Sequence, residues 1–286
     1  MSTSPIRRAP ELDLPSWQAQ GFLVCPGFVD ERDLAVVRAQ AQMLVHALAP
    51  AAAPAVFSSR DPARSADAAL LASAHAVHAF FEEDAVDAHG ALCVPPERAI
   101  NKIGHSLHTL DPVFAPFTRR PGLAALAATL GLAQTRWMQS QLIFKQPGIG
   151  GEVRWHQDAS YFLTTPQSVT TFWLALEDAT LDNGCLWVLP GGHCGPLREV
   201  VVRDGARLRQ QTLDPMPWPA QRDALPLAVP AGTLICLHGH LPHCSDANRS
   251  PRSRLAYVLH AVDGTAAYSA ANWLQPLAED PPAANL

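Results

Sequence analysis

From residue 137 onward, the chain consists of short apolar segments separated by turns rich in Gly, Pro, Asp and Asn, such as Asp182-Asn183-Gly184. In one segment, 169–176, alternate residues would lie on opposite faces, which is the two-residue period of a strand. Many short strands that follow a few helices indicate a jelly-roll or cupin-type barrel. The expected strands cover residues 137–145, 152–158, 169–176, 185–189, 233–237 and 253–262.

The earlier part of the chain carries helical patterns instead. Asp30 can cap a helix at 31–48, in which apolar residues recur at helical spacing. The other expected elements are a strand at 21–25, an irregular connection at 49–64, and helices at 67–83 and 122–130.

We therefore expect a single domain over 1–286 that is mainly β with flanking helices. Its core would be a double-stranded β-helix (jelly-roll, cupin-like) at about 95–265. A helical N-terminal part at about 10–135 would buttress the core, and a C-terminal tail would occupy 266–286.

The motif His156-Gln157-Asp158 ends the second expected strand. Alternation along a strand would put His156 and Asp158 on one face and turn Gln157 away. A metal held by these two side chains needs a third donor, and the candidate is His243, which follows His156 by 87 positions (243 − 156). Two imidazoles and one carboxylate on one side of a metal form the facial triad of non-heme Fe(II) oxygenases, which leaves the opposite face open.

Arg254 follows His243 by eleven positions (254 − 243) and begins an apolar run at 255–260. An arginine beside such a run is rarely buried without a partner. A carboxylate that accepts a fork of two hydrogen bonds would be a suitable partner. Fe(II) with Asp158 leaves one positive charge and Arg254 adds another, so a dicarboxylate co-substrate would neutralise both.

The composition limits the class of partner. The net charge is −5, with 21 Lys+Arg against 26 Asp+Glu, and no basic stripe is present, so we expect no nucleic-acid partner. No apolar run reaches transmembrane length, and residues 1–15 lack the apolar segment of a secretion signal. We therefore expect no membrane partner and a cytoplasmic location. The cysteines show no CxxC pairing, which fits reduced thiols, and a monomer is compatible with this sequence.

Beyond the metal motif, five stretches resemble the phytanoyl-CoA dioxygenase family of Fe(II)/2-oxoglutarate oxygenases. Within this family they resemble in particular the branch of phytanoyl-CoA dioxygenase domain-containing proteins. The resemblance runs through nearly the whole chain, from residue 21 onward. The five stretches are PPERAINKIGH at 95–105, IFKQP at 143–147, GGEVRWHQDAS at 150–160, EDATLDNGCLW at 177–187 and NWLQP at 272–276.

The resemblance implies Fe(II), 2-oxoglutarate and O₂ as cofactors and co-substrates, with ascorbate as an activator. It implies His156, Asp158 and His243 as the iron ligands. It also implies that Arg254 anchors the distal carboxylate of 2-oxoglutarate and that Ser245 donates a hydroxyl beside it.

Three further residues match positions that the family places at the 2-oxoglutarate site. Lys102 matches a family lysine, and Trp173 matches a ring packed near the co-substrate. Gln141 also lines the site, where the nearest relatives carry an apolar methionine. The polar Gln141 would either reach the 2-oxo acid or point away.

Other roles compete for the histidines. A structural zinc site could use His238, His240, His243 and Cys244, although zinc sites usually show two separated ligand pairs. His240 is also a rival of His243 for the iron. The serine two positions after His243 and the arginine eleven after it favour His243. His260 lies six positions after Arg254 (260 − 254) on its face of the strand and could approach the site.

Simpler structural roles also compete for the co-substrate residues. Lys102 would be a solvated loop lysine if the resemblance were set aside. Trp173 in an alternating strand could be a core residue, and Ser245 could cap the turn that follows it. Arg252 could replace Arg254, but Pro251 beside it suggests a loop. The remaining histidines that we interpret as structural are His105, His108 and His193.

The function expected from these residues is oxidative decarboxylation of 2-oxoglutarate to succinate and CO₂, coupled to hydroxylation of a small-molecule substrate. Asp158 favours hydroxylation over chlorination, because related halogenases lack this carboxylate and leave room for halide. Two alternatives would be a non-catalytic sensor of Fe(II) and 2-oxoglutarate, and a cupin-type isomerase or hydrolase. The second alternative would not need Arg254. Nothing in the sequence identifies the substrate.

Overall fold

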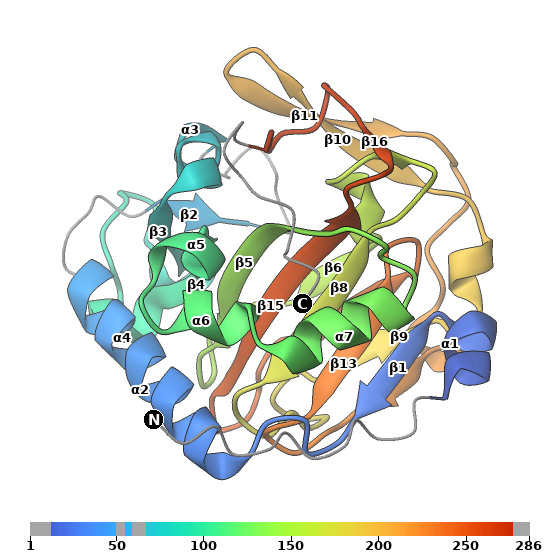
Figure 1. Ribbon diagram of the computed structural model, residues 1–286. Helices are drawn as coiled ribbons and strands as arrows, with labels where there is room; N and C mark the ends of the chain where they lie inside the picture. The colour runs from blue at the N-terminus through green and yellow to red at the C-terminus, as the bar shows by residue number, and fades with distance from the viewer. Residues whose placement is uncertain (1–12, 50–54, 59–66, 277–286) are drawn as a thin grey trace.

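The computed structural model describes residues 13–49, 55–58 and 67–276 of the chain. Within these residues, two sheets form the centre of the molecule (Figure 1). The larger sheet has eight strands in the order β1 (Phe22–Cys25), β13 (Leu234–His238), β8 (Thr170–Ala175), β15 (Arg254–Asp263), β5 (Thr135–Lys145), β4 (Ile100–His105), β3 (Val77–Glu82) and β2 (Val56–Phe57).

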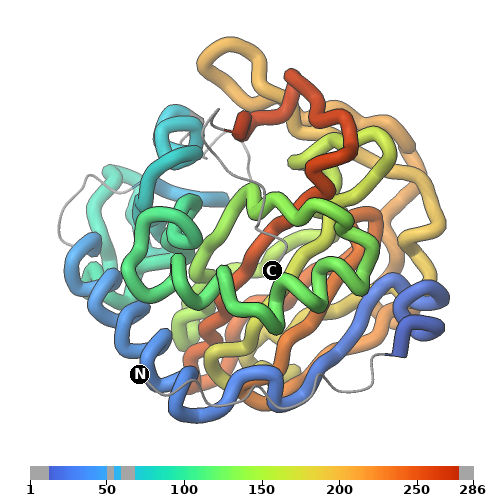
Figure 2. The backbone as a smooth tube through the Cα atoms, viewed as in Figure 1, coloured from blue at the N-terminus to red at the C-terminus, as the bar shows by residue number. Residues whose placement is uncertain are grey.

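The smaller sheet carries much of the candidate site. Its four strands are β12 (Leu225–Leu227), β9 (Leu186–Val188), β14 (His243–Ser245) and β6 (Val153–His156), in that order and antiparallel. Two short ribbons complete the β-structure, one of β10 (Glu199–Asp204) with β11 (Arg207–Thr212) and one of β7 (Thr164–Thr165) with β16 (Ala267–Tyr268). Figure 2 shows the β10–β11 hairpin at one end of the molecule, beside the red segment that contains β16.

The helices cover the outer face of the large sheet (Figure 1). The sheet presents alternate apolar residues, among them Phe172, Leu174 and Tyr257, to a core that helices also line. The longest helix begins where Asp30 accepts a hydrogen bond from the backbone N–H of Asp33, which is the expected cap. The α-helices are α1 (Leu14–Gln20), α2 (Glu31–Leu48), α3 (Asp67–Ala72), α4 (Pro96–Ala99), α5 (Leu107–Leu110), α6 (Phe114–Thr118) and α7 (Pro121–Thr129).

A second core lies between the two sheets. Trp173, Ala175 and Val258 of the large sheet pack there with Leu186 and Val188 of the small sheet. This division confirms the alternation expected in 169–176, because Trp173 and Ala175 face the inter-sheet core while Phe172, Leu174 and Leu176 face the helices. The sheet pair confirms the double-stranded β-helix with flanking helices.

Several local expectations are confirmed and others are wrong. The helix expected at 122–130 is α7, whereas the helix expected at 67–83 is not continuous. Helix α3 ends at Ala72, a 3₁₀ turn follows, and β3 occupies Val77–Glu82 because it pairs with β4. Strand β6 also ends earlier than expected, at His156, so Asp158 opens a 3₁₀ turn instead of continuing the strand.

The connection expected at 49–64 lies largely outside the described residues, as does the whole of the tail from 277 onward. In the part of the chain that is described, no helix has both the length and the apolar character needed to cross a membrane.

Candidate metal centre

The two candidate histidines face each other across neighbouring strands. His156 of β6 and His243 of β14 are paired in register, and their ring centroids lie 4.2 Å apart. Asp158 follows two residues after His156, where Gln157 is still extended (φ −125°, ψ 130°). The extended residue preserves the alternation, so the carboxylate returns to the side of His156 although the strand has ended.

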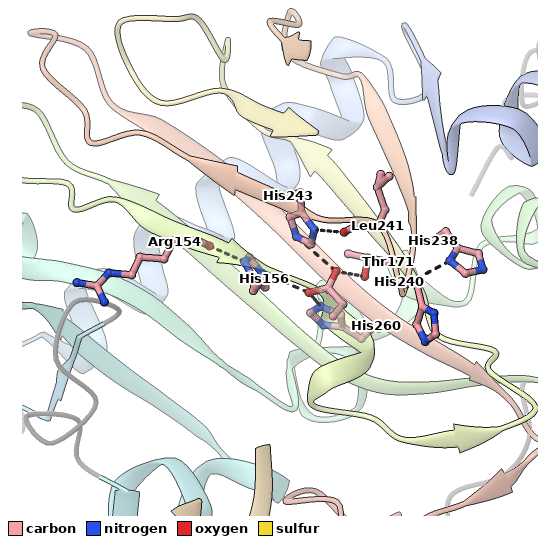
Figure 3. A network of polar contacts seen from close by, with 9 residues as sticks. Arg154, His156, Thr171, His238, His240, Leu241, His243 and His260 are labelled. Atoms are coloured by element: carbon pink, nitrogen blue, oxygen red, sulfur yellow. Dashed lines mark hydrogen bonds and ion pairs between the residues drawn. The ribbon is translucent and has the colours of Figure 1, made fainter. Parts of the chain in front are cut away.

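Ligand atoms of His156, Asp158 and His243 all lie within 4.8 Å of one another, which is close enough to hold one metal ion. Asp158 Oδ1 lies 3.5 Å from His156 Nε2, and Asp158 Oδ2 lies 3.6 Å from His243 Nε2 (Figure 3). Among the described residues, this is the one such group of three or more His, Cys, Asp or Glu side chains.

Backbone carbonyls fix the orientation of both rings. Nδ1 of His156 lies 2.8 Å from the carbonyl oxygen of Arg154, and Nδ1 of His243 lies 3.0 Å from that of Leu241 (Figure 3). A carbonyl can only accept, so each Nδ1 carries the proton and donates it. Each Nε2 is then left with a free lone pair directed to the space beside Asp158, as a metal-binding histidine requires.

The charge states of His243 and Asp158 suit metal binding. Burial alone would lower the pKa of His156, but its contacts with Asp158 raise it. Burial and the neighbouring His156 together lower the pKa of His243 to about 4, so His243 is neutral at pH 7. Burial alone would raise the pKa of Asp158, but His243, His260 and His156 hold it well below its usual range. A neutral imidazole and an ionised carboxylate are the forms that bind a metal.

Gln157 fixes the segment between the first two ligands. Its side chain is fully buried, donates to the carbonyl oxygens of Pro196 (3.0 Å) and His240 (2.8 Å), and accepts from the backbone N–H of Arg198 (2.9 Å). These bonds tie the ligand-bearing turn after β6 to the segment that leads into β14. The sequence predicts that Gln157 points away from the metal, but it does not indicate that Gln157 holds the two segments together.

Asp158 has two further neighbours, Thr171 and His260. The Thr171 hydroxyl donates a 2.5 Å hydrogen bond to Asp158 Oδ2, and His260 Nε2 lies 3.5 Å from Oδ1. Thr171 and His260 face each other on β8 and β15, so the carboxylate lies above a cross-strand pair. The prediction that His260 could approach the site is confirmed, whereas Thr171 was not predicted as a site residue.

Arg254 is buried at the start of β15 with 1% of its surface exposed. Its Nε and Nη1 atoms are buried and have no hydrogen-bond partner among the described residues. The guanidinium carbon lies 5.6 Å from the centroid of the Trp173 ring. Arg252 is exposed, so Arg254 is the buried one of the two candidate arginines. An unpaired buried guanidinium is costly unless a ligand supplies an acceptor.

The strand register arranges the other expected residues in rows across the large sheet. Val258 of β15 pairs with Gln141 on one side and with Trp173 on the other, and this row lies between Arg254 and His260 along β15. Oε1 of Gln141 is buried without a hydrogen-bond partner in the described part of the chain. Trp173 belongs to the inter-sheet core, as its structural role predicts, and its ring also faces the Arg254 guanidinium.

Lys102 belongs to β4 and is 9% exposed, so its interpretation as a solvated loop lysine is wrong. Its ammonium lies 3.2 Å from the centroid of the Phe57 ring, and burial lowers its pKa to about 7. Ser245 is buried inside β14, two positions after His243, and not in the turn that follows.

Lys145 and Glu82 are two buried charged residues that sequence reasoning missed. Lys145 pairs with Arg254 across β5 and β15, and its ammonium donates to the carbonyl oxygens of Gly151 and Asp246, both at 2.6 Å. Glu82 accepts from the backbone N–H of Gly151 at 3.2 Å, and burial raises its pKa to about 7. Each is held by loop backbone, and no local sequence pattern indicates such contacts.

The rival zinc site is not formed. His243 is directed to Asp158, while Nδ1 of His238 accepts from the backbone N–H of His240 at 3.1 Å.

The histidines interpreted as structural have partners. Ser73 Oγ lies 2.7 Å from His105 Nδ1, Ser140 Oγ lies 2.8 Å from His108 Nδ1, and the Gln18 carbonyl oxygen lies 3.1 Å from His193 Nε2.

Comparisons with known proteins agree on one family. The sequence model of the family described as Phytanoyl-CoA dioxygenase (PhyH) matches residues 17–256. The chain is 40% identical over 264 residues to Phytanoyl-CoA dioxygenase of Arabidopsis thaliana, and the match covers 92% of each chain. It is 39% identical over 277 residues to Phytanoyl-CoA dioxygenase domain-containing protein 1 of Bos taurus, with 94% of this chain and 95% of that protein covered.

Two solved structures share the fold. One is the epimerase SnoN in complex with Fe3+, alpha ketoglutarate and nogalamycin RO, with a TM-score of 0.63, 18% identity, and 93% of this chain and 89% of that chain covered. The other is EctD from S. alaskensis with 2-oxoglutarate and 5-hydroxyectoine, with a TM-score of 0.58, 19% identity, and 92% and 78% covered.

Proposed function

The chain belongs to the phytanoyl-CoA dioxygenase (PhyH) family, and from this premise we propose that it is an Fe(II)- and 2-oxoglutarate-dependent dioxygenase that hydroxylates a small molecule. His156, Asp158 and His243 hold the iron, and Arg254 binds the distal carboxylate of 2-oxoglutarate. The whole of 1–286 serves this one site as a single domain.

The observation that carries this proposal is the contrast between Arg254 and its neighbour Lys145. Both cations are buried at 1% exposure and face each other on adjacent strands. Lys145 is held by backbone carbonyls, whereas Nε and Nη1 of Arg254 have no partner among the described residues. A carboxylate from a ligand would supply an acceptor to this guanidinium, and the same ligand would supply the second charge of a dicarboxylate.

The donor set fits the metal as well. Two neutral imidazoles and one carboxylate are the protein ligands of non-heme Fe(II) oxygenases, and they leave the remaining positions to co-substrate and O₂. When bound, Fe(II), 2-oxoglutarate and O₂ supply the oxidising chemistry, in which 2-oxoglutarate yields succinate and CO₂ and the substrate gains a hydroxyl group. Ascorbate acts as an activator by keeping the iron reduced.

The protein itself contributes position and charge. The carbonyls of Arg154 and Leu241 hold the two ligand rings in one tautomer and orientation. Arg254 sets the far end of the co-substrate, and Trp173 lies against the guanidinium. The polar side chains that complete the co-substrate site are those of Lys102, Gln141 and Ser245, of which Gln141 has a free acceptor in the described part of the chain.

The proposal is tested by measuring succinate formed from 2-oxoglutarate by purified protein with Fe(II), ascorbate and air. His156→Ala and Arg254→Ala serve as inactive variants, and Arg252→Ala, an exposed arginine two positions away, serves as the matched control. We expect succinate from the wild type and from Arg252→Ala, and none above background from the other two.

Direct binding separates the proposed enzyme from a non-catalytic sensor. A protein that binds 2-oxoglutarate in an Arg254-dependent manner, but forms no succinate with any of a broad set of small molecules, would be a sensor. Failure to bind 2-oxoglutarate at all, in the presence of metal, would reject both functions.

A further inference from the structure

The two oxygens of the Asp158 carboxylate have different neighbours. Oδ2 accepts a 2.5 Å hydrogen bond from the Thr171 hydroxyl and lies 3.6 Å from His243 Nε2. Oδ1 lies 3.5 Å from His156 Nε2 and 3.5 Å from His260 Nε2. A charge-assisted O–H···O⁻ bond of this length is among the strong hydrogen bonds of proteins, so Thr171 occupies Oδ2 firmly.

The scaffold beneath the carboxylate is rigid. Thr171 is 2% exposed and lies in β8, which pairs with β13 on one side and with β15 on the other. Its partner in register on β15 is His260, which is 5% exposed and packs against the Phe162 ring at a centroid distance of 5.2 Å. The strand pairing therefore holds the Thr171 backbone in place beside Oδ2.

From these contacts, and resting on the proposed function, we infer that Thr171 is a positioning residue that restricts Asp158 to binding the metal through one oxygen, Oδ1. A carboxylate that chelates with both oxygens takes one more coordination position than a carboxylate that uses one. Three positions must stay open for the two donor atoms of 2-oxoglutarate and for O₂. By engaging Oδ2, Thr171 keeps the third position available.

The substitution that tests this inference is Thr171→Val, which keeps the shape and removes the hydroxyl. Thr171→Ser restores a hydroxyl on the same carbon. Thr170→Val is the matched control, because Thr170 is equally buried in the same strand but faces the opposite side of the sheet. Thermal unfolding of the metal-free proteins verifies that all three variants fold.

The first readout is metal affinity, measured by calorimetric titration with Co(II) in air and Fe(II) under nitrogen. We expect Thr171→Val to bind metal roughly 10-fold more tightly, because Oδ2 no longer has to give up the Thr171 hydrogen bond before it can join Oδ1 on the metal. Thr171→Ser and Thr170→Val should bind as the wild type does. Wild-type affinity in a folded Thr171→Val protein would overturn the inference.

The second readout is the coordination mode, seen in crystal structures of wild type and Thr171→Val loaded with Co(II) and 2-oxoglutarate. We expect one Asp158 oxygen, Oδ1, on the metal in the wild type and both oxygens in the variant. Coordination through Oδ2 in the wild type would contradict the inference.

His156→Ala distinguishes this inference from the proposed function. If His156→Ala retains wild-type Co(II) affinity, the metal assignment itself is wrong. If His156→Ala loses the metal while Thr171→Val binds it with wild-type affinity, only the role of Thr171 is wrong.

Discussion

Replacing Arg254 with Met should stabilise the metal-free protein while removing 2-oxoglutarate binding. The guanidinium is 1% exposed, and its Nε and Nη1 have no partner among the described residues. Each unsatisfied buried donor costs about 1–3 kcal/mol, so relief at two atoms contributes about 2 kcal/mol or more to the free energy of unfolding. Met fills a similar length without polar atoms. At roughly 2–4 °C per kcal/mol, the unfolding temperature should rise by about 4–8 °C.

The same substitution removes one partner of a buried charge pair with the co-substrate. Such losses cost about 2–5 kcal/mol, which corresponds to an affinity for 2-oxoglutarate that is weaker by roughly 30-fold to several thousand-fold. Calorimetric titration of 2-oxoglutarate into the Co(II)-loaded proteins measures this change. Differential scanning calorimetry of the metal-free proteins measures the stability.

Lys145→Met is the matched control. Lys145 is as buried as Arg254 and faces it in register, but its ammonium donates to the carbonyl oxygens of Gly151 and Asp246. Removing the ammonium deprives both carbonyls of a donor, so the unfolding temperature should fall. The reasoning is refuted if both substitutions shift stability in the same direction, or if Arg254→Met binds 2-oxoglutarate as the wild type does.

Three further outcomes are expected. Asp158→Ala should abolish succinate formation and metal binding, and full activity in that variant would reject the ligand assignment. Burial lowers the pKa of Lys102 and Lys145 to about 7 in the folded protein. Above pH 7 these two lysines therefore hold fewer protons in the folded chain than in the unfolded chain. The free energy of unfolding should rise from pH 7 to 9 as a result. Urea denaturation should show a smaller rise in Lys102→Met, and an equal rise would argue against the buried charge. Asp30→Ala should lower the free energy of unfolding by about 1 kcal/mol through loss of the α2 cap and leave the affinity for 2-oxoglutarate unchanged.

Elements that depend on local interactions were predictable from the sequence. Helix α2 has its bounds at Glu31–Leu48 because a capping aspartate precedes a long apolar stripe, and both lie within one segment. The alternating residues of β8 likewise revealed which side chains face the inter-sheet core. The candidate ligand motif was predictable for the same reason, since two of its three residues, His156 and Asp158, are two positions apart.

Elements that depend on distant partners were not predictable. The Ala-rich stretch before β3 favours a helix locally, but Val77–Glu82 becomes a strand because β4 lies beside it. Thr171 and Lys145 have ordinary local sequences, and their roles arise from contacts with Asp158 and with the loops at Gly151 and Asp246. Alternation correctly put Thr171 on the face of Trp173, but only the turn after β6 brings Asp158 over it.

Strand β15 also has a consequence for which 2-oxo acid the site accepts. It is paired on both sides, every one of its residues is buried, and it carries Arg254 at one end and His260, beside the metal ligands, six residues further on. A strand that is paired on both sides cannot lengthen or shorten, so it fixes the distance between the guanidinium of Arg254 and the candidate metal position. Under the proposed function this fixed span would select the co-substrate by chain length, so oxaloacetate, one carbon shorter than 2-oxoglutarate, should bind more weakly.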